Sequence, residues 1–235
     1  MPRDVGVVIV AAGRGTRFGG EVPKQYRELG GVPMLLRALR PFTAHPDVAH
    51  TVVVLPPADA DRPPGWLADQ LGGSLTVVAG GAERHDSVAL GLAALPGPCA
   101  IVLVHDAARP LVDRGTIDGV IAAARRGDGA VPAVPLGDTL KEAAETAPGT
   151  VEERGYPVVG RTVPRDRLWQ AQTPQGFPRA LLEEAHARAR QEGIAVTDDA
   201  MLVERLGARV RLVPGSPLNF KVTTEDDFKL AERLL

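Results

Sequence analysis

The chain has 235 residues, enough to bury a large core, and we expect a single domain over residues 1–235. Its 27 basic and 29 acidic residues leave a net charge of −2, which argues against a nucleic-acid or membrane surface, so any anion site must be local. The single cysteine, Cys99, excludes an internal disulfide and favours a reducing compartment, so we expect a cytoplasmic protein.

The first predicted element is the apolar run VGVVIV at 5–10, which we interpret as a buried strand of a parallel sheet. A short signal peptide is disfavoured because the apolar stretch from Val5 to Ala12 has only eight residues and Asp4 interrupts its positive flank. No apolar run approaches the length that spans a bilayer.

A glycine-rich stretch, AAGRGTRFGGEVPKQY, follows at 11–26. It departs from the dinucleotide fingerprint because Phe18 stands where the third glycine belongs, and from the phosphate-binding P-loop because Glu21 follows Gly20 in place of lysine. What remains is a loop whose glycines let backbone N–H groups approach a ligand, with Arg17 and Lys24 within reach. An ordinary turn would explain the glycines, but the two cations favour a site for a triphosphate.

Further short, β-branched runs predict strands at 51–55, 75–78, 100–104, 130–134 and 209–213. Apolar residues at three- and four-residue spacing predict helices between most of them, at 34–44 behind Pro33, 87–95, 116–126 and 179–191 behind Pro178. Two more helices are predicted to begin near Thr197 and at Thr224. This alternation predicts an α/β fold with a mostly parallel sheet, whose ligand crevice lies beyond the carboxyl ends of the strands.

The alternation breaks between Pro135 and Trp169, where charges, prolines and glycines mix without a helical stripe. Such a stretch is typical of a protruding arm, an inserted hairpin or a disordered segment. The β-branched run YPVVGRTV at 156–163 favours a hairpin, so we predict an inserted arm at about 136–166.

The segment VHDAARP at 104–110 places a carboxylate and a guanidinium at the end of a predicted strand. Asp106 could hold Mg²⁺ or accept a hydroxyl hydrogen bond while Arg109 grips a phosphate. Equally, Asp106 could cap the following turn and pair with Arg109, and this motif alone does not decide between them. His105, at the end of a buried strand, is typical of a structural hydrogen-bonding residue.

Two other segments carry weaker signals. AGGAERHDSV at 79–88 places two glycines ahead of a helix, with Arg84 and Ser87 near its start; alone, it is a loop with a cap. NFKVTTEDD at 219–227 carries Lys221 on a short extended run, where a surface lysine is the default interpretation.

Together with GDTLK, TVPRDRLWQAQTPQGF and TDDA, these segments resemble, in this order, the 2-C-methyl-D-erythritol 4-phosphate cytidylyltransferase family of the non-mevalonate isoprenoid pathway. The likeness spans almost the whole chain. The GxGxR loop followed by PKQ is shared with many nucleotidyltransferases, whereas HDAARP with TPQGF and the arm is narrower. The resemblance implies a Rossmann-like nucleotidyltransferase fold with a protruding dimerisation arm. It also implies Mg²⁺-dependent transfer of CMP from CTP to 2-C-methyl-D-erythritol 4-phosphate, which gives 4-diphosphocytidyl-2-C-methyl-D-erythritol and pyrophosphate.

The resemblance also implies roles for particular residues. The cytidine and phosphate site would be lined by Ala11, Ala12, Gly13, Gly15, Gly81 and Ser87. The catalytic cations would be Arg17, Lys24 and Lys221. The acceptor pocket would contain Asp106, Arg109 and Thr173, with Thr139 and Arg165 of the partner subunit. The metal would be held by Asp106 or only by the CTP phosphates. The sequence departs from the family pattern at Val10, often proline, and at Ala82, where a polar residue often sits beside the base.

Three other functions compete with this interpretation. A cytidylyltransferase for ribitol 5-phosphate or another sugar phosphate would use the same glycine-rich loop. A non-catalytic nucleotide-binding module could lose the cations Arg17, Lys24 and Lys221, so their presence counts against it. A nicotinamide-dependent oxidoreductase is disfavoured by Phe18 in the glycine pattern.

Overall fold

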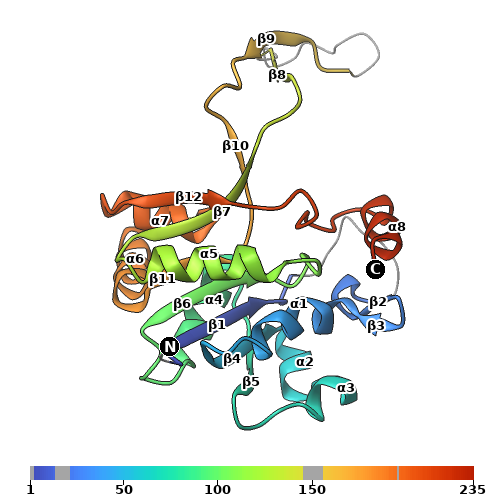
Figure 1. The fold of residues 1–235 in the computed structure, drawn as a ribbon, viewed down its shortest axis with the longest axis vertical. Coiled ribbons are helices and arrows are strands. Elements are labelled where there is room, and N and C mark those ends of the chain that lie inside the picture. The colour runs from blue at the N-terminus through green and yellow to red at the C-terminus, as the bar shows by residue number, and fades with distance from the viewer. Residues whose placement is uncertain (1–2, 14–21, 145–155, 195) are drawn as a thin grey trace.

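The computed structural model describes residues 3–13, 22–144, 156–194 and 196–235, which form an α/β fold around one large sheet (Figure 1). The strand order is β10-β7-β11-β6-β1-β4-β5, with β12 beside β7. Every adjacent pair is parallel except those that involve β10 or β11, so the predicted α/β class with a mostly parallel sheet is confirmed. In chain order the strands are β1 (Val5–Val10), β4 (Val48–Leu55), β5 (Leu75–Ala79), β6 (Ile101–Asp106), β7 (Gly129–Pro135), β10 (Trp169–Ala171), β11 (Gln175–Pro178) and β12 (Val210–Pro214).

Helices cover both faces of this sheet because side chains alternate along its strands. Val7 and Ile9 of β1 pack on one face with α1 (Met34–Thr43) and α5 (Arg114–Ala124). Val8 packs on the opposite face with α4 (Arg84–Ala93), α6 (Arg179–Glu192) and α7 (Asp199–Arg205). The remaining elements are η1 (Lys24–Tyr26), β2 (Glu28–Leu29), β3 (Val32–Pro33), α2 (Pro57–Asp61), α3 (Gly65–Ala68) and α8 (Glu225–Arg233).

Caps fix the starts of the two last helices. The Asp198 side chain accepts a hydrogen bond from the Met201 backbone at the start of α7, and Thr224 with Asp227 forms a capping box at the start of α8. Each cap satisfies backbone N–H groups that have no partner within the helix. Both helices therefore begin where the sequence predicts, within two residues.

The predicted hairpin is present beyond the end of β7. β8 (Leu140–Ala143) pairs antiparallel with β9 (Val159–Val163) in a two-stranded sheet of its own. This hairpin projects far from the central sheet, and the chain returns from it into β10 (Figure 1). Residues 145–155 of the arm lie outside the described residues.

The carboxyl ends of β1 and β6 bring the chemically rich segments together. Val10 lies beside Asp106 in the register of these two strands. Past the strand ends, the backbone N–H of Ala11 donates to Val54 and that of Ala107 to Val10, while Gly80 donates to Leu55 beyond β5. The segments after β1, β5 and β6 therefore emerge at one edge of the sheet, where an α/β fold places its ligand site.

Candidate active site

Two adjoining cavities open at this edge. The first has a volume of about 300 Å³ and lies between the ends of β1 and β6, η1, the start of α4 and the segment around Lys221. The second, of about 170 Å³, is lined by residues that include Arg109, Thr173 and Gln175. Both cavities are lined by Arg84, Asp106 and Lys221. These three side chains thus form a shared wall.

The first cavity collects most of the residues that the resemblance assigns to the nucleotide. It is lined by Ala11, Ala12, Gly13, Gly81, Ser87, Lys24 and Lys221, together with the atypical Ala82. Gly15 and Arg17 lie outside the described residues. The structure therefore brings the described members of this set together around one space.

Glycine is needed where two loops meet in this cavity. A Cβ atom on Gly80 would lie 2.5 Å from the Ala12 Cβ and 2.8 Å from the Ser87 Oγ, closer than real Cβ contacts allow. The backbone N–H of Gly81 donates to the buried Ser87 Oγ at 3.1 Å. The loop after β5 can therefore close against the loop after β1 only because it carries no side chain here.

Lys24 is held at the first cavity by hydrogen bonds that it and its neighbour Gln25 make to two different segments. Its Nζ donates to the Val222 carbonyl at 3.0 Å, and the neighbouring Gln25 Nε2 donates to the Ala11 carbonyl at 3.2 Å. The residue next to Val222 is Lys221, which lines the same cavity. Two ammonium groups from distant parts of the sequence thus line the first cavity.

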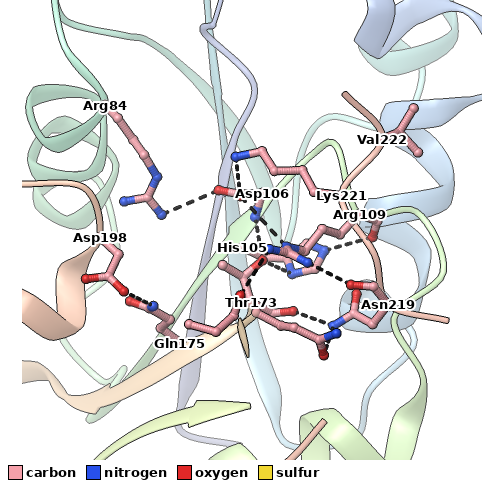
Figure 2. A network of polar contacts seen from close by, with 12 residues as sticks. Arg84, His105, Asp106, Arg109, Thr173, Gln175, Asp198, Asn219, Lys221 and Val222 are labelled. Carbon is pink, nitrogen blue, oxygen red and sulfur yellow. Dashed lines mark hydrogen bonds and ion pairs between the residues drawn. The ribbon is translucent and has the colours of Figure 1, made fainter. Parts of the chain in front are cut away.

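Asp106 is a buried carboxylate that faces three cations (Figure 2). Its Oδ2 lies 2.8 Å from the Lys221 Nζ and 3.9 Å from the Arg109 Nε, while its Oδ1 lies 3.5 Å from the Arg84 Nη2. Burial alone would raise the pKa of Asp106, but Arg84, Lys221 and Arg109 together hold that pKa well below its usual value. The carboxylate is therefore ionised at neutral pH.

A chain of hydrogen bonds runs beneath Asp106. The buried His105 Nε2 faces the Arg109 carbonyl at 3.1 Å, so this nitrogen carries the proton and Nδ1 accepts from the Thr173 hydroxyl at 3.1 Å. Thr173 Oγ1 in turn accepts from the backbone N–H of Asp106 at 3.0 Å. Burial lowers the pKa of His105 to about 4, so the ring is neutral and, as predicted, structural.

Arg109 joins the three segments of the second cavity. Its Nη1 donates to the Asn219 carbonyl at 2.7 Å and its Nη2 approaches the Ala171 carbonyl at 3.4 Å, while the Asn219 Nδ2 donates to the Thr173 carbonyl at 2.8 Å. Its Nε lies farther from Asp106 Oδ2, at 3.9 Å. Much of the Arg109 donor capacity is therefore spent on the backbone, beside the cavity that it lines.

Nearly the whole chain matches the model of a protein family. The model of the 2-C-methyl-D-erythritol 4-phosphate cytidylyltransferase family matches residues 5–235. The chain belongs to this family. Membership confirms the predicted function, CTP-dependent cytidylyl transfer in the methylerythritol phosphate pathway, and the predicted enzyme class, a nucleotidyltransferase.

Individual relatives agree with this family. A 2-C-methyl-D-erythritol 4-phosphate cytidylyltransferase of Streptomyces coelicolor is 49% identical over 239 residues, which cover 100% of this chain and 86% of the relative. One of Salinibacter ruber is 45% identical over 97% of this chain and 91% of the relative. The crystal structure of the Thermus thermophilus cytidylyltransferase superposes with a TM-score of 0.80 at 41% identity over 98% of both chains, which confirms the nucleotidyltransferase fold.

A bifunctional relative is longer. The bifunctional enzyme IspD/IspF of Rhodospirillum rubrum is 48% identical over 231 residues, which cover 98% of this chain. The chain spans only 56% of the length of that relative. The similarity to it therefore concerns this cytidylyltransferase unit.

The cytidylyltransferase site also contains residues that sequence analysis did not assign. Arg84 donates through Nη1 to the Asp199 Oδ2 at 2.7 Å, and Gln175 donates through Nε2 to the Asp198 Oδ2 at 2.8 Å. Asn219 is fully buried, and its Nδ2 donates to the Thr173 carbonyl. Arg84, Asp198 and Asn219 all lie in motifs quoted for the resemblance, so the available signal was their position in those motifs.

The two residues expected from a partner subunit lie apart from this site. Thr139 and Arg165 are exposed on the arm and line neither cavity of their own chain. Arg165 donates to the Gly137 carbonyl across the base of the hairpin. Within one chain, the described site therefore lacks both.

Proposed function

We propose that the first cavity binds CTP and that the second binds 2-C-methyl-D-erythritol 4-phosphate, with CMP transferred across their shared wall. The observation that carries this proposal is that Arg84, Asp106 and Lys221 line both cavities. A nucleotide in the first cavity and an acceptor in the second would both contact these three side chains. Their phosphates could therefore meet beside them. Nearly all of the rate enhancement from such an arrangement comes from positioning and electrostatics.

In the proposed reaction, an oxygen of the acceptor phosphate attacks the α-phosphorus of CTP in line with the departing pyrophosphate. One oxygen–phosphorus bond forms and the bond from the α-phosphorus to the bridging oxygen breaks, so the leaving group carries away its electron pair. Lys24, Lys221 and Arg17 offset the negative charge that gathers when two anions meet. No covalent intermediate on the protein and no general base are required, because the acceptor phosphate is already ionised.

The second cavity has the charge that a polyol phosphate requires. Three cations, Arg84, Arg109 and Lys221, line it beside the carboxylates of Asp106 and Asp198, and these cations can bind a phosphate. The ionised Asp106 can accept hydrogen bonds from the acceptor hydroxyl groups. An anionic alcohol phosphate thus finds both kinds of partner here.

We propose that Mg²⁺ reaches this site on the phosphates of CTP. No group of three or more His, Cys, Asp or Glu side chains is placed to hold a metal ion among the described residues. Asp106 does not fit the role of metal ligand well, because both its oxygens face cations. When bound, Mg²⁺ would neutralise phosphate charge, and it usually needs few protein ligands when a substrate supplies phosphate oxygens.

We also propose that the chain is a homodimer through the arm. Tyr156, Val158 and Val159 are exposed by 76%, 61% and 56% on a hairpin that stands away from the core. An isolated two-stranded hairpin is marginal in water, so a second copy packed on these side chains would stabilise it. The same packing would bring Thr139 and Arg165 of the partner subunit to the second cavity.

We further propose the binding partners and the cellular location of the protein. The substrates are CTP and a polyol phosphate, and neither nucleic acid nor a membrane is a partner. None of the described helices has the length and apolar character of a membrane span. The near-neutral net charge and the single cysteine support a cytoplasmic protein.

Pyrophosphate release tests this proposal. The purified protein with Mg²⁺ is offered CTP, ATP, GTP or UTP, each with 2-C-methyl-D-erythritol 4-phosphate or ribitol 5-phosphate. We expect release only from CTP with the methylerythritol phosphate. Turnover with ribitol 5-phosphate would replace the acceptor, and silence in every pairing from folded protein would contradict the proposal.

A further inference from the structure

Arg84 bridges two carboxylates at the wall between the cavities, and the reaction as proposed does not explain this bridge. Its Nη1 lies 2.7 Å from the Asp199 Oδ2 and its Nη2 lies 3.5 Å from the Asp106 Oδ1. It is the first residue of α4, whose start is fixed by a capping box between Glu83 and Asp86. Figure 2 shows its guanidinium extended toward Asp106.

Asp199 holds Arg84 from the interior. It is 0% exposed, lines neither cavity, and its second oxygen lies 3.1 Å from the His186 Nε2. Burial alone would raise the pKa of Asp199, but His186 and Arg84 lower it, so the carboxylate is ionised. Asp199 therefore places a fixed negative charge behind the Arg84 guanidinium and cannot itself touch a ligand.

The two oxygens of Asp106 have different partners. Oδ2 faces Lys221 at 2.8 Å and Arg109 at 3.9 Å, whereas the cation that faces Oδ1 is Arg84. Without Arg84, the electrostatic pull on Asp106 would come only from the side of Lys221 and Arg109. The carboxylate would then turn toward those two residues and present a different edge to the second cavity.

We propose that Arg84, clamped by the buried Asp199, is a positioning residue for the acceptor: it holds the Asp106 carboxylate in the orientation that receives the acceptor hydroxyl groups. This inference rests on the proposed assignment of the second cavity to the acceptor. It deepens that assignment, because it makes an interior carboxylate with no access to the cavity a determinant of acceptor binding.

The planar arrangement of donors on the Arg84 guanidinium distinguishes this role from that of a simple positive charge. A guanidinium presents several donors in one plane and can hold two carboxylates at once, whereas an ammonium is a compact point charge. Arg84→Lys should therefore raise the KM for the acceptor at least tenfold, and by a clearly larger factor than the Kd for CTP, whose cavity Arg84 also lines. Arg84→Ala should show the same split, and added guanidinium ion below denaturing concentration should restore part of the acceptor affinity.

Asp199 provides the second half of the test. Asp199→Asn keeps the size of the side chain and removes its charge, and it should raise the acceptor KM in the same direction. Because Asp199 acts through Arg84, Asp199→Asn should raise the acceptor KM of the Arg84→Lys protein by less than a further twofold. If the two substitutions instead have fully additive effects on the free energy that corresponds to the acceptor KM, the proposal that Asp199 acts through Arg84 is overturned.

Arg125 is the matched control, because its guanidinium also spans two carboxylates, those of Asp4 and Asp47, and it lines neither cavity. Arg125→Lys should lower the thermal stability and leave both kinetic constants unchanged. An equal rise in the Kd for CTP and the acceptor KM in Arg84→Lys, or an unchanged acceptor KM, would overturn the proposal. Absence of acceptor-dependent turnover in the wild type would instead contradict the proposed function.

Discussion

Asp106 illustrates how single residues set the charge of this site. The carboxylate is buried, yet Arg84, Lys221 and Arg109 keep it ionised. A buried charge is costly unless it is paired, so removal of one of these cations disturbs the others. The chemistry therefore depends on the balance of the cluster and not on one side chain.

Lys24→Ala should lower kcat roughly a hundredfold and at least as strongly as it weakens CTP binding, because charge neutralisation matters most in the transition state. Steady-state kinetics measures both effects. Lys229→Ala is the control, since that exposed lysine of α8 pairs only weakly with Asp226 at 3.5 Å. A higher KM with unchanged kcat in Lys24→Ala would contradict the catalytic role.

His105 predicts a dependence of stability on pH. Its pKa is lowered from 6.5 to about 4 in the folded protein, so between these values the unfolded chain binds a proton that the folded chain does not. The free energy of unfolding should fall by about 3 kcal/mol as pH drops from 6.5 to 4. Denaturant unfolding of the wild type and of His105→Gln measures this; equal slopes in both proteins over this window would refute the assignment.

Residue types and their order predict much of the candidate site, whereas its partners depend on the fold. Lys24, Asp106 and Lys221 are recognisable in their motifs, and the structure brings them together at one sheet edge. The clamp of Arg84 by Asp199 joins residues 115 positions apart, and local patterns do not encode such a distance. Likewise, only the position of the Arg109 carbonyl shows that the His105 Nδ1 accepts the hydrogen bond from the Thr173 hydroxyl.

At the scale of elements, the close packing of α4 on the sheet allows a direct test. A Cβ on Gly91 would lie 2.5 Å from the Val8 Cγ1 and 2.9 Å from the Val54 Cγ2. Gly91→Ala should therefore cost about 1–3 kcal/mol of stability through overpacking. Gly119→Ala in α5 is the control, because nothing lies within 4 Å of its added methyl, and it should stabilise by about 0.5–1 kcal/mol. Calorimetric melting that ranks the two variants in the opposite order would contradict this packing.

The predictability of the elements follows their local chemistry. The six runs rich in β-branched residues all lie on strands, because such side chains suit a pleated, buried surface. β10 and β11 were not predicted, since WQA and QGFP are short and lack β-branched residues. β11 is nevertheless central, where Phe177 is fully buried and Gly176 lets Val120 and Leu103 approach.

At the scale of the whole molecule, the arm predicts an active site shared between subunits. Each site would use Lys24 of one chain and Arg165 of the other, so neither single variant would have a complete site. Mixing Arg165→Ala protein with Lys24→Ala protein should restore about a quarter of wild-type activity, because half of the random dimers gain one intact site of two. No recovery after verified subunit exchange would count against the shared site.

The Lys24→Ala, Arg165→Ala double variant is the control for this mixing experiment. Mixed with wild-type protein, it forms dimers in which each site lacks one of the two residues. Activity should therefore fall below that expected from the wild-type chains alone. If each chain carried a complete site, dilution with the double variant would leave the activity per wild-type chain unchanged.

The measurement that tests the central claim most directly follows the phosphorus atoms of CTP. With the label on the α-phosphorus, we predict that it appears in a product that contains the acceptor, while label on the γ-phosphorus appears only in pyrophosphate. Both should depend on the presence of 2-C-methyl-D-erythritol 4-phosphate. Transfer of the γ-label to the acceptor, or release of pyrophosphate without acceptor, would contradict cytidylyl transfer across the shared wall of the two cavities.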